Sequence, residues 1–225
     1  MIKSLKTKDG SLTLFSEKFQ ETYHSRHGAL TESLHVFIEN GLAYKAKSNQ
    51  TVKVGEIGLG TGLNAMLSLQ FAQRNQTKID YVAMEAFPLS NSIKNELIAD
   101  YHIFNPEIYA KILHQPEAQS IEPDPYFSFQ WYEKKWPQAN PFEDLDVIFY
   151  DAFAPDTQPE LWDENAMNAA FSSLKPGGIL VTYCAKGYVR RNLINAGFIV
   201  ERLQGPPGKR EMLRGTNGKS VERVN

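Results

Sequence analysis

The stretch Val54-Gly-Glu-Ile-Gly-Leu-Gly-Thr-Gly-Leu-Asn64 decides the fold of this chain. An apolar run that begins at Val52 leads into it and carries the acid Glu56. Glycines follow at positions 58, 60 and 62, and apolar residues then recur at helical spacing from Leu63 to Phe71. A strand, a glycine turn and a helix N-terminus together let backbone N–H groups approach a ligand closely. We therefore expect a ligand site at this turn.

The details of the glycine run exclude two common phosphate sites. The dinucleotide fingerprint G-x-G-x-x-G requires a small residue where Leu63 stands, and the Gly-Lys-Ser/Thr ending of the P-loop is missing. The pattern E-x-G-x-G-x-G instead resembles motif I of the S-adenosylmethionine-dependent methyltransferases, where the glycines admit the amino-acid end of the cofactor. This resemblance implies a set of cofactor-binding residues, which are Glu56, Gly58, Gly60, Gly62 and Asn64.

Composition and length indicate an ordinary globular protein. The chain has 225 residues, of which 42% are hydrophobic and 22% charged. This length suits a single α/β domain over residues 1–225, which we divide into an N-terminal cap (1–50) and a catalytic core (51–225). The sequence has neither an apolar run of membrane-spanning length nor a secretory signal, so we expect a cytoplasmic enzyme with no membrane partner. Cys184 is the only cysteine, and the five histidines lack metal-ligand spacing, so no metal site is expected. No sequence feature indicates an oligomeric state.

Strand and helix patterns alternate along the chain. A hairpin is predicted around Asp9-Gly10, followed by a helix from Leu30 that ends at Gly41. Further strands are predicted over 79–85, 127–131, 145–150, 179–183 and 198–203, with 211–214 available to pair with the last. Helical pieces are predicted over 90–118, 161–174 and 189–195, the second of which ends at Lys175-Pro-Gly-Gly178. This order predicts a Rossmann-like, doubly wound and mostly parallel sheet behind an N-terminal hairpin and helix cap.

Two acids stand at the ends of predicted strands, where ligands of open α/β sheets bind. Glu85 ends the strand after the glycine turn, and its carboxylate can accept hydrogen bonds from both ribose hydroxyls of a nucleoside cofactor. Asp151 ends the fourth strand. An acid at a strand end can also cap a turn or helix. Two such acids at matching positions behind a glycine turn favour a binding site.

Motifs along nearly the whole chain narrow the resemblance. They are Tyr23–Ile38, Gly58–Asn64, Glu85–Pro88, Asp151–Pro155, Pro159–Trp162, Ala185–Leu193, Ala196–Phe198 and Gly208–Leu213. Together they resemble the tRNA 5-methylaminomethyl-2-thiouridine methyltransferase family, the methylase half of bifunctional MnmC proteins. The chain resembles a stand-alone methylase without the flavin-dependent oxidase domain, so no flavin is implied. Ala152 stands where many relatives have glycine, and Glu133 is a candidate adenine contact.

The resemblance implies methylation of the exocyclic primary amine of 5-aminomethyl-(2-thio)uridine at the tRNA wobble position. The donor would be S-adenosylmethionine, and the partner would be the tRNA anticodon stem-loop. Methyl transfer from a sulfonium is an in-line displacement, so the enzyme mainly positions its reactants. Because an ordinary aspartate has a pKa near ~3.9, it is a weak base toward an alkylammonium. We therefore expect Asp151 to orient the amine by hydrogen bonding and to share proton removal with water.

Candidate substrate residues fall into two groups. Phe153, with Tyr23 or Trp162, can stack on a flipped base, although ordinary core packing is the alternative for each ring. Glu32 is expected either at the cofactor or at the substrate amine.

The second group is basic. From Lys186 onward the chain carries nine basic and three acidic residues, which gives +6 there against −8 in the preceding part. Such asymmetry fits a cationic docking surface or a solvated charged face. The candidate phosphate contacts are Lys186, Arg190, Arg191, Lys209 and Arg210. Two alternatives remain: a methyltransferase for small-molecule amines, or a catalytically inactive tRNA-binding relative.

Overall fold

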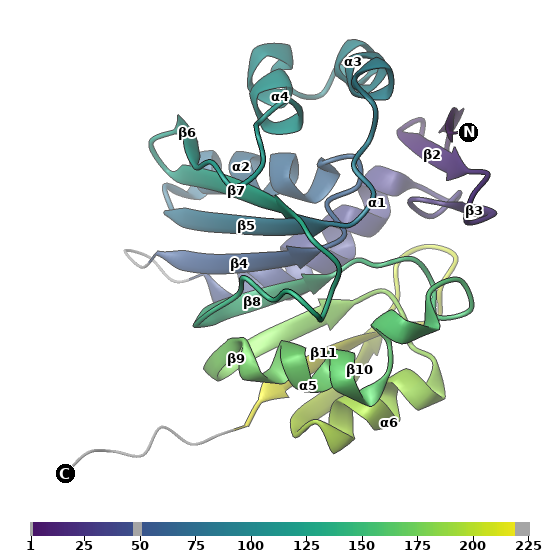
Figure 1. The fold of residues 1–225 in the computed structure, drawn as a ribbon, viewed down its shortest axis with the longest axis vertical. Coiled ribbons are helices and arrows are strands. Elements are labelled where there is room, and N and C mark those ends of the chain that lie inside the picture. Colours follow the sequence, from purple (N-terminus) through teal and green to yellow (C-terminus); the bar gives the residue numbers. More distant parts are fainter. Residues whose placement is uncertain (1, 47–50, 219–225) are drawn as a thin grey trace.

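The computed structural model describes residues 2–46 and 51–218. Within these residues the strands form a three-stranded sheet, β1-β2-β3, and an eight-stranded sheet in the order β10-β11-β9-β8-β4-β5-β7-β6 (Figure 1). The small sheet consists of β1 (Ile2–Lys6), β2 (Leu12–Ser16) and β3 (Glu21–Thr22). The strands of the large sheet are β4 (Val52–Ile57), β5 (Ile79–Glu85), β6 (Ile121–Asp124), β7 (Phe127–Glu133), β8 (Leu145–Tyr150), β9 (Leu174–Thr182), β10 (Phe198–Gln204) and β11 (Glu211–Asn217).

The centre of the large sheet is parallel and its edges are antiparallel. β9, β8, β4, β5 and β7 pair in parallel, whereas β6, β10 and β11 pair antiparallel to their neighbours. The expected pairing of 211–214 with 198–203 is confirmed, since Met212 lies opposite Leu203. The predicted doubly wound, mostly parallel sheet is therefore confirmed.

Helices cover both faces of this sheet (Figure 1). One face packs against the π-helical segment η1 (Leu34–Ala43) and α2 (Leu63–Asn75), and α1 (Ala29–Ser33) packs on both of these helices. The opposite face packs against α5 (Glu164–Ser172) and α6 (Gly187–Asn195). The helices α3 (Asn91–Asp100) and α4 (Pro106–Leu113) lie between β5 and β6 in the chain, and the short η2 (Pro159–Leu161) precedes α5.

Side chains of β8 alternate between the two cores. Val147 and Phe149 join the core beneath η1 and α2, whereas Ile148 and Tyr150 join the core with Trp162 and α5. Successive side chains of a strand point to opposite faces, so a central strand that is covered on both sides is apolar throughout. The unbroken apolar run Val147–Tyr150 follows from this arrangement.

The N-terminal hairpin forms as predicted and is fastened to α1. Gly10 has a φ of 83° in the turn, which glycine adopts at no steric cost. Asp9 Oδ2 accepts a hydrogen bond from the backbone N–H of Thr31 at 3.0 Å. A Cβ on Gly28 would lie 2.4 Å from the same oxygen, so the hairpin packs directly on the start of α1. This contact fixes the helix that carries Glu32.

Two predicted boundaries are wrong. The helix does not end at Gly41, because this residue lies inside η1 and lets the segment approach the sheet; a Cβ there would lie 2.9 Å from Val181 Cγ2. Lys175-Pro-Gly-Gly178 is not the turn that ends a helix, because α5 ends at Ser172 and these residues already belong to β9. The pairing of β9 with β8 shifts register between Leu145 and Val147, and this irregularity accommodates the proline and glycines within the strand.

Candidate active site

Three neighbouring parallel strands, β4, β5 and β8, end at the glycine turn. The backbone N–H of Asp151 donates to the carbonyl oxygen of Ile57 at 3.0 Å. The backbone N–H of Gly60 donates to Glu85 Oε2 at 2.9 Å. Gly58 has a φ of 95°, and a Cβ there would lie 2.6 Å from the carbonyl oxygen of Asp151, so no larger residue fits. The turn thus brings both strand-end acids against one loop.

A cavity of about 170 Å³ opens at this edge of the sheet. Gly58, Gly60 and Asn64 line it from the glycine turn, and Glu85 and Asp151 line it from the strand ends. A further wall comes from a loop after β7, which our sequence analysis did not single out: Lys134, Lys135, Trp136 and Gln138. Glu133, the candidate adenine contact, is exposed and does not line the cavity. Trp136, five residues beyond the predicted strand 127–131, was the available signal for this loop.

Two of the motif residues lie behind the cavity rather than on its wall. Glu56 is fully buried. Gly62 has a φ of 71° at the start of α2, and a Cβ there would lie 3.1 Å from Leu113 Cδ2. Gly62 therefore allows α4 to pack closely on the turn, and both residues support the loop instead of lining the cavity.

Asn64 joins the buried acid to the acid at the cavity. Its Nδ2 donates to Glu56 Oε1 at 2.9 Å and to Asp151 Oδ2 at 2.8 Å. Within the described part of the chain, Glu56 Oε2 and Asn64 Oδ1 have no hydrogen-bond partner. Burial and the nearby Asp151 raise the pKa of Glu56 well above its ordinary 4.5. These effects favour the neutral acid at this position.

The pKa of Asp151 differs from the value that the sequence suggested. Burial, followed by the charge of Glu32, raises it from 3.8 to about 8, against the opposing effects of the Asn64 hydrogen bond and the Lys209 charge. Our expectation of a weak base assumed an ordinary aspartate. A carboxylate with this pKa is much better matched to an alkylammonium and can accept its proton.

Glu85 is held by backbone N–H groups. Its Oε2 accepts from Gly60 and its Oε1 accepts from Phe87 at 2.8 Å. An ionised carboxylate has about four lone-pair positions, so capacity remains for two hydroxyl donors. The geometry fits the predicted ribose contact.

Aromatic side chains form the wall beyond Asp151. Tyr23 and Phe153 both line the cavity, with ring centroids 5.0 Å apart, and Phe19 lies 4.8 Å from Phe153. The prediction that Trp162 stacks on a base is wrong, because its side chain is fully buried. Its Nε1 donates to the carbonyl oxygen of Phe153 at 2.8 Å, so Trp162 supports the aromatic wall from behind.

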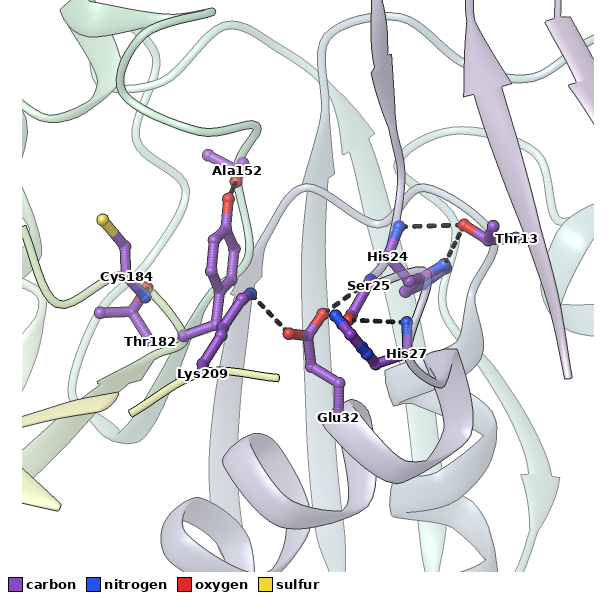
Figure 2. Close-up of polar contacts among 10 residues, drawn as sticks. Thr13, His24, Ser25, His27, Glu32, Ala152, Thr182, Cys184 and Lys209 are labelled. Atoms are coloured by element: carbon purple, nitrogen blue, oxygen red, sulfur yellow. Dashed lines mark hydrogen bonds and ion pairs between the residues drawn. The ribbon is translucent and has the colours of Figure 1, made fainter. Parts of the chain in front are cut away.

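Glu32 and Lys209 meet close to this site (Figure 2). Lys209 Nζ lies 2.5 Å from Glu32 Oε2, and the backbone N–H of Ser25 donates to Glu32 Oε1 at 3.0 Å. We predicted Lys209 as a phosphate contact, but the structure gives its ammonium a carboxylate partner inside the protein. His24 lies nearby, and burial lowers its pKa to about 4, which leaves it neutral at pH 7.

The other candidate phosphate contacts lie outside the cavity wall. Lys186 pairs with Asp156, Arg190 is half-buried, and Arg191 and Arg210 are exposed. Lys219 and Arg223, which contribute to the basic excess of the C-terminal region, lie outside the described residues.

Among residues 2–46 and 51–218, no three histidine, cysteine, aspartate or glutamate side chains are grouped so that they could hold a metal ion. The lone cysteine, Cys184, is buried. None of the helices that the structure describes is long and apolar enough to cross a membrane.

Known proteins resemble this chain in both sequence and fold. A family model described as S-adenosyl-L-methionine-dependent methyltransferase matches residues 129–218. The chain is 30% identical, over 95% of its length, to the tRNA 5-methylaminomethyl-2-thiouridine biosynthesis bifunctional protein MnmC of Vibrio cholerae serotype O1 (strain M66-2). It is 31% identical, over 89% of its length, to the protein of the same name from Ectopseudomonas mendocina (strain ymp). It spans 35% and 33% of these two relatives.

Among solved structures, MNMC2 from Aquifex aeolicus superposes with a TM-score of 0.80 at 24% identity, covering all of this chain and 73% of that one. In sequence and in fold, the chain resembles MnmC proteins. Spermidine synthase from Thermotoga maritima shares the fold with a TM-score of 0.57 at 14% identity, covering 97% of this chain and 70% of that one.

The protein thus has the α/β fold of S-adenosylmethionine-dependent methyltransferases, and the prediction of that cofactor is confirmed. The cavity fits this group. A Cβ at Gly58 would collide with the backbone of Asp151, so the glycine keeps the turn open, and Glu85 has acceptor capacity beside it. When bound, the cofactor supplies an electrophilic methyl group on a sulfonium.

Proposed function

We propose that this protein methylates the exocyclic primary amine of 5-aminomethyl-(2-thio)uridine at the wobble position of tRNA. The observation that carries this proposal is the Asp151 carboxyl, which lies on the cavity wall beside the glycine turn with a pKa raised to about 8. An ammonium has no lone pair, so an amine methyltransferase needs a proton acceptor at this place.

In the proposed reaction, Asp151 is the proton acceptor. The carboxylate takes the proton of the acceptor ammonium, and the freed nitrogen lone pair forms the N–C bond. The C–S bond of a bound sulfonium would break with its electron pair passing to sulfur. The methylated product would form as a secondary ammonium, and the proton on Asp151 would pass to water. The positive charge of the arriving ammonium favours the ionised form of Asp151. Tyr23 and Phe153 offer ring faces against which an extruded base can stack.

The choice of tRNA over a small amine rests on the relatives' names and on charge. Both MnmC relatives are named for tRNA 5-methylaminomethyl-2-thiouridine biosynthesis. The basic candidates outside the cavity, Lys186, Arg190, Arg191 and Arg210, would contact phosphates of the anticodon stem-loop. A tRNA substrate would place the enzyme in the cytoplasm.

The test is methyl transfer from labelled S-adenosylmethionine to tRNA that carries 5-aminomethyl-(2-thio)uridine at the wobble position and lacks only the methyl group, with a panel of small primary amines in parallel. We expect label at the wobble uridine of the tRNA and none with Asp151→Asn. Fully modified tRNA is the matched control and should accept no labelled methyl group. Label in the small amines alone would reject the tRNA assignment.

A further inference from the structure

The ammonium of Lys209 is enclosed by an acid and a ring. Its Nζ lies 2.5 Å from Glu32 Oε2 and 3.8 Å from the centroid of the Tyr183 ring. The Glu32 side chain is only 8% exposed and that of Lys209 32%. An ion pair shielded to this degree is weakened less by salt than a surface pair. Lys209 is therefore a partly buried charge beside the site, although neither it nor Glu32 lines the cavity.

The loop that carries Lys209 is also fixed by its backbone. β11 runs back between β10 and β9, which brings the loop between β10 and β11 to the carboxyl edge of the sheet. The N–H of Gly205 donates to the carbonyl oxygen of Arg210 at 3.1 Å and closes the loop. A Cβ on Gly208 would lie 2.3 Å from His27 Cδ2, so the loop packs directly on the N-terminal segment.

Tyr183 connects Lys209 to the residue after Asp151. Its hydroxyl donates to the carbonyl oxygen of Ala152 at 2.7 Å. The ring that receives the Lys209 ammonium thus also holds the backbone next to Asp151. The N-terminal segment, the loop 205–210 and the end of β8 meet at this point.

Resting on the proposed function, we propose that Lys209 is a positioning residue of the methyl-acceptor site. Held by Glu32 and Tyr183, its fixed positive charge favours the ionised form of Asp151 and the neutral form of the acceptor amine. It would act through Asp151 and the amine without touching the transferred methyl group.

The charges around Lys209 support this role. Titratable groups face it from several segments: Glu32 on α1, Asp151 after β8, Tyr183 and Cys184 after β9, and His24 before α1. The Lys209 charge lowers the pKa of Asp151, whereas Glu32 raises it. A nearby cation also lowers the pKa of an ammonium, because it disfavours a second positive charge. Both effects lower the pH at which the acceptor amine becomes reactive.

The experiment compares Lys209→Met, which removes the charge, with Lys209→Arg, which keeps it. Single-turnover methylation of tRNA that carries 5-aminomethyl-(2-thio)uridine at the wobble position is measured from pH 6 to pH 10 at saturating substrates. For Lys209→Met we expect the acid limb to move up by about one pH unit, with a loss of about tenfold at pH 7 that recovers above pH 9. Lys209→Arg should keep the wild-type profile.

A pH-independent loss in both variants would mean that Lys209 only holds the loop, and the inference would be rejected. An unchanged pH profile together with weaker tRNA binding and a reduced salt slope would make Lys209 a phosphate contact, which also rejects it. Thermal melting and calorimetric cofactor binding verify that each variant folds, and Lys209→Gln replaces Lys209→Met if the latter does not.

A second measurement separates this inference from the proposed function. Carbon-13 NMR titrates the Asp151 carboxyl directly, assigned by its loss in Asp151→Asn. We expect a higher pKa of Asp151 in Lys209→Met than in the wild type, whatever the substrate. If the wild type methylates no tRNA, the proposed function fails, and this titration still decides whether Lys209 controls Asp151. Equal pKa values would overturn the inference alone.

Discussion

The Asn64 side-chain amide donates a hydrogen bond of 2.8 Å to Oδ2 of Asp151. The same nitrogen donates to the buried Glu56, so one amide on the first turn of α2 fixes the acid after β8 against the acid within β4. Asn64 was predicted as a cofactor contact. It lines the cavity, and its contacts also make it the support of the proposed proton acceptor.

Replacing Asn64 by alanine tests this support. The variant loses the bond that lowers the pKa of Asp151, so we expect kcat to fall by about tenfold or more, with the acid limb of the pH profile moving upward. Steady-state kinetics with separate kcat and KM for the methyl donor are the measurement. Gln70→Ala on the same helix, which breaks a bond to the carbonyl oxygen of Ile103, is the control and should change neither constant. A rise in KM for the methyl donor at constant kcat would show that Asn64 only binds the cofactor and does not support Asp151.

Asp151→Asn should stabilise the protein in a pH-dependent way. The pKa of Asp151 is about 8 in the folded protein against 3.8 ordinarily, so the folded state holds this proton more tightly than the unfolded chain. The wild type therefore loses stability as pH rises from about 4 to about 8, and the asparagine variant does not. Because Asp151 is only partly buried, we expect a gain of roughly 2–4 kcal/mol at pH 8 and above.

Urea denaturation of both proteins at several pH values measures this gain. Asp156→Asn is the control, because the Asp156 side chain is 80% exposed, and its effect should be small at every pH. A stability difference for Asp151→Asn that stays constant from pH 5 to pH 9 would show that Asp151 titrates normally.

Gly58→Ala should disable the cofactor site, because a Cβ there would lie 2.6 Å from the backbone oxygen of Asp151. Gly177→Ala is a matched control, since Gly177 also has a positive φ, 75°, but its Cβ would meet nothing within 4 Å. We expect Gly177→Ala to cost about 1 kcal/mol of folding stability and to bind S-adenosylhomocysteine normally. Gly58→Ala should cost more and bind it at least about tenfold more weakly. If calorimetry gave Gly58→Ala and Gly177→Ala equal affinities for S-adenosylhomocysteine, the glycine turn would not be part of the cofactor site.

Glu85 and Glu133 are two strand-end acids that lie opposite each other in register between β5 and β7. Replacing each in turn shows which of them contacts the cofactor. Glu85 lines the cavity and Glu133 does not. We expect Glu85→Gln to weaken S-adenosylhomocysteine binding by about tenfold, because an amide replaces one of two acceptor oxygens. Glu133→Gln should leave the dissociation constant nearly unchanged. The reverse order would place the nucleoside on the β7 side of the cavity.

Local patterns were enough to predict the strands and the turn that form the site. β5 spans 79–85 as predicted, because its apolar run ends in an acid at a strand end, and the glycines after β4 have positive φ values as a tight turn requires. Both features depend on residues adjacent in the chain.

Features that depend on packing between distant segments could not be predicted. Gly41 was expected to end a helix, but its role depends on the approach of Val181. Trp162 was a candidate stacking residue, yet α5 and α6 enclose it. The partner of Lys209 is Glu32, 177 positions away, and it becomes visible only when β11 brings the loop back to the site. The loop at 134–138 also lines the cavity only because the fold brings it next to the glycine turn, which is distant in the chain.

Calorimetric titration of the folded wild-type protein with S-adenosylhomocysteine tests the central claim most directly, namely that the cavity between Gly58, Glu85 and Asp151 seats the methyl donor. We predict saturable binding of one ligand per chain that weakens in Gly58→Ala and in Glu85→Gln but not in Gly177→Ala. Absence of binding heat across a range of temperatures, in protein whose circular dichroism shows the expected α/β content, would contradict the account.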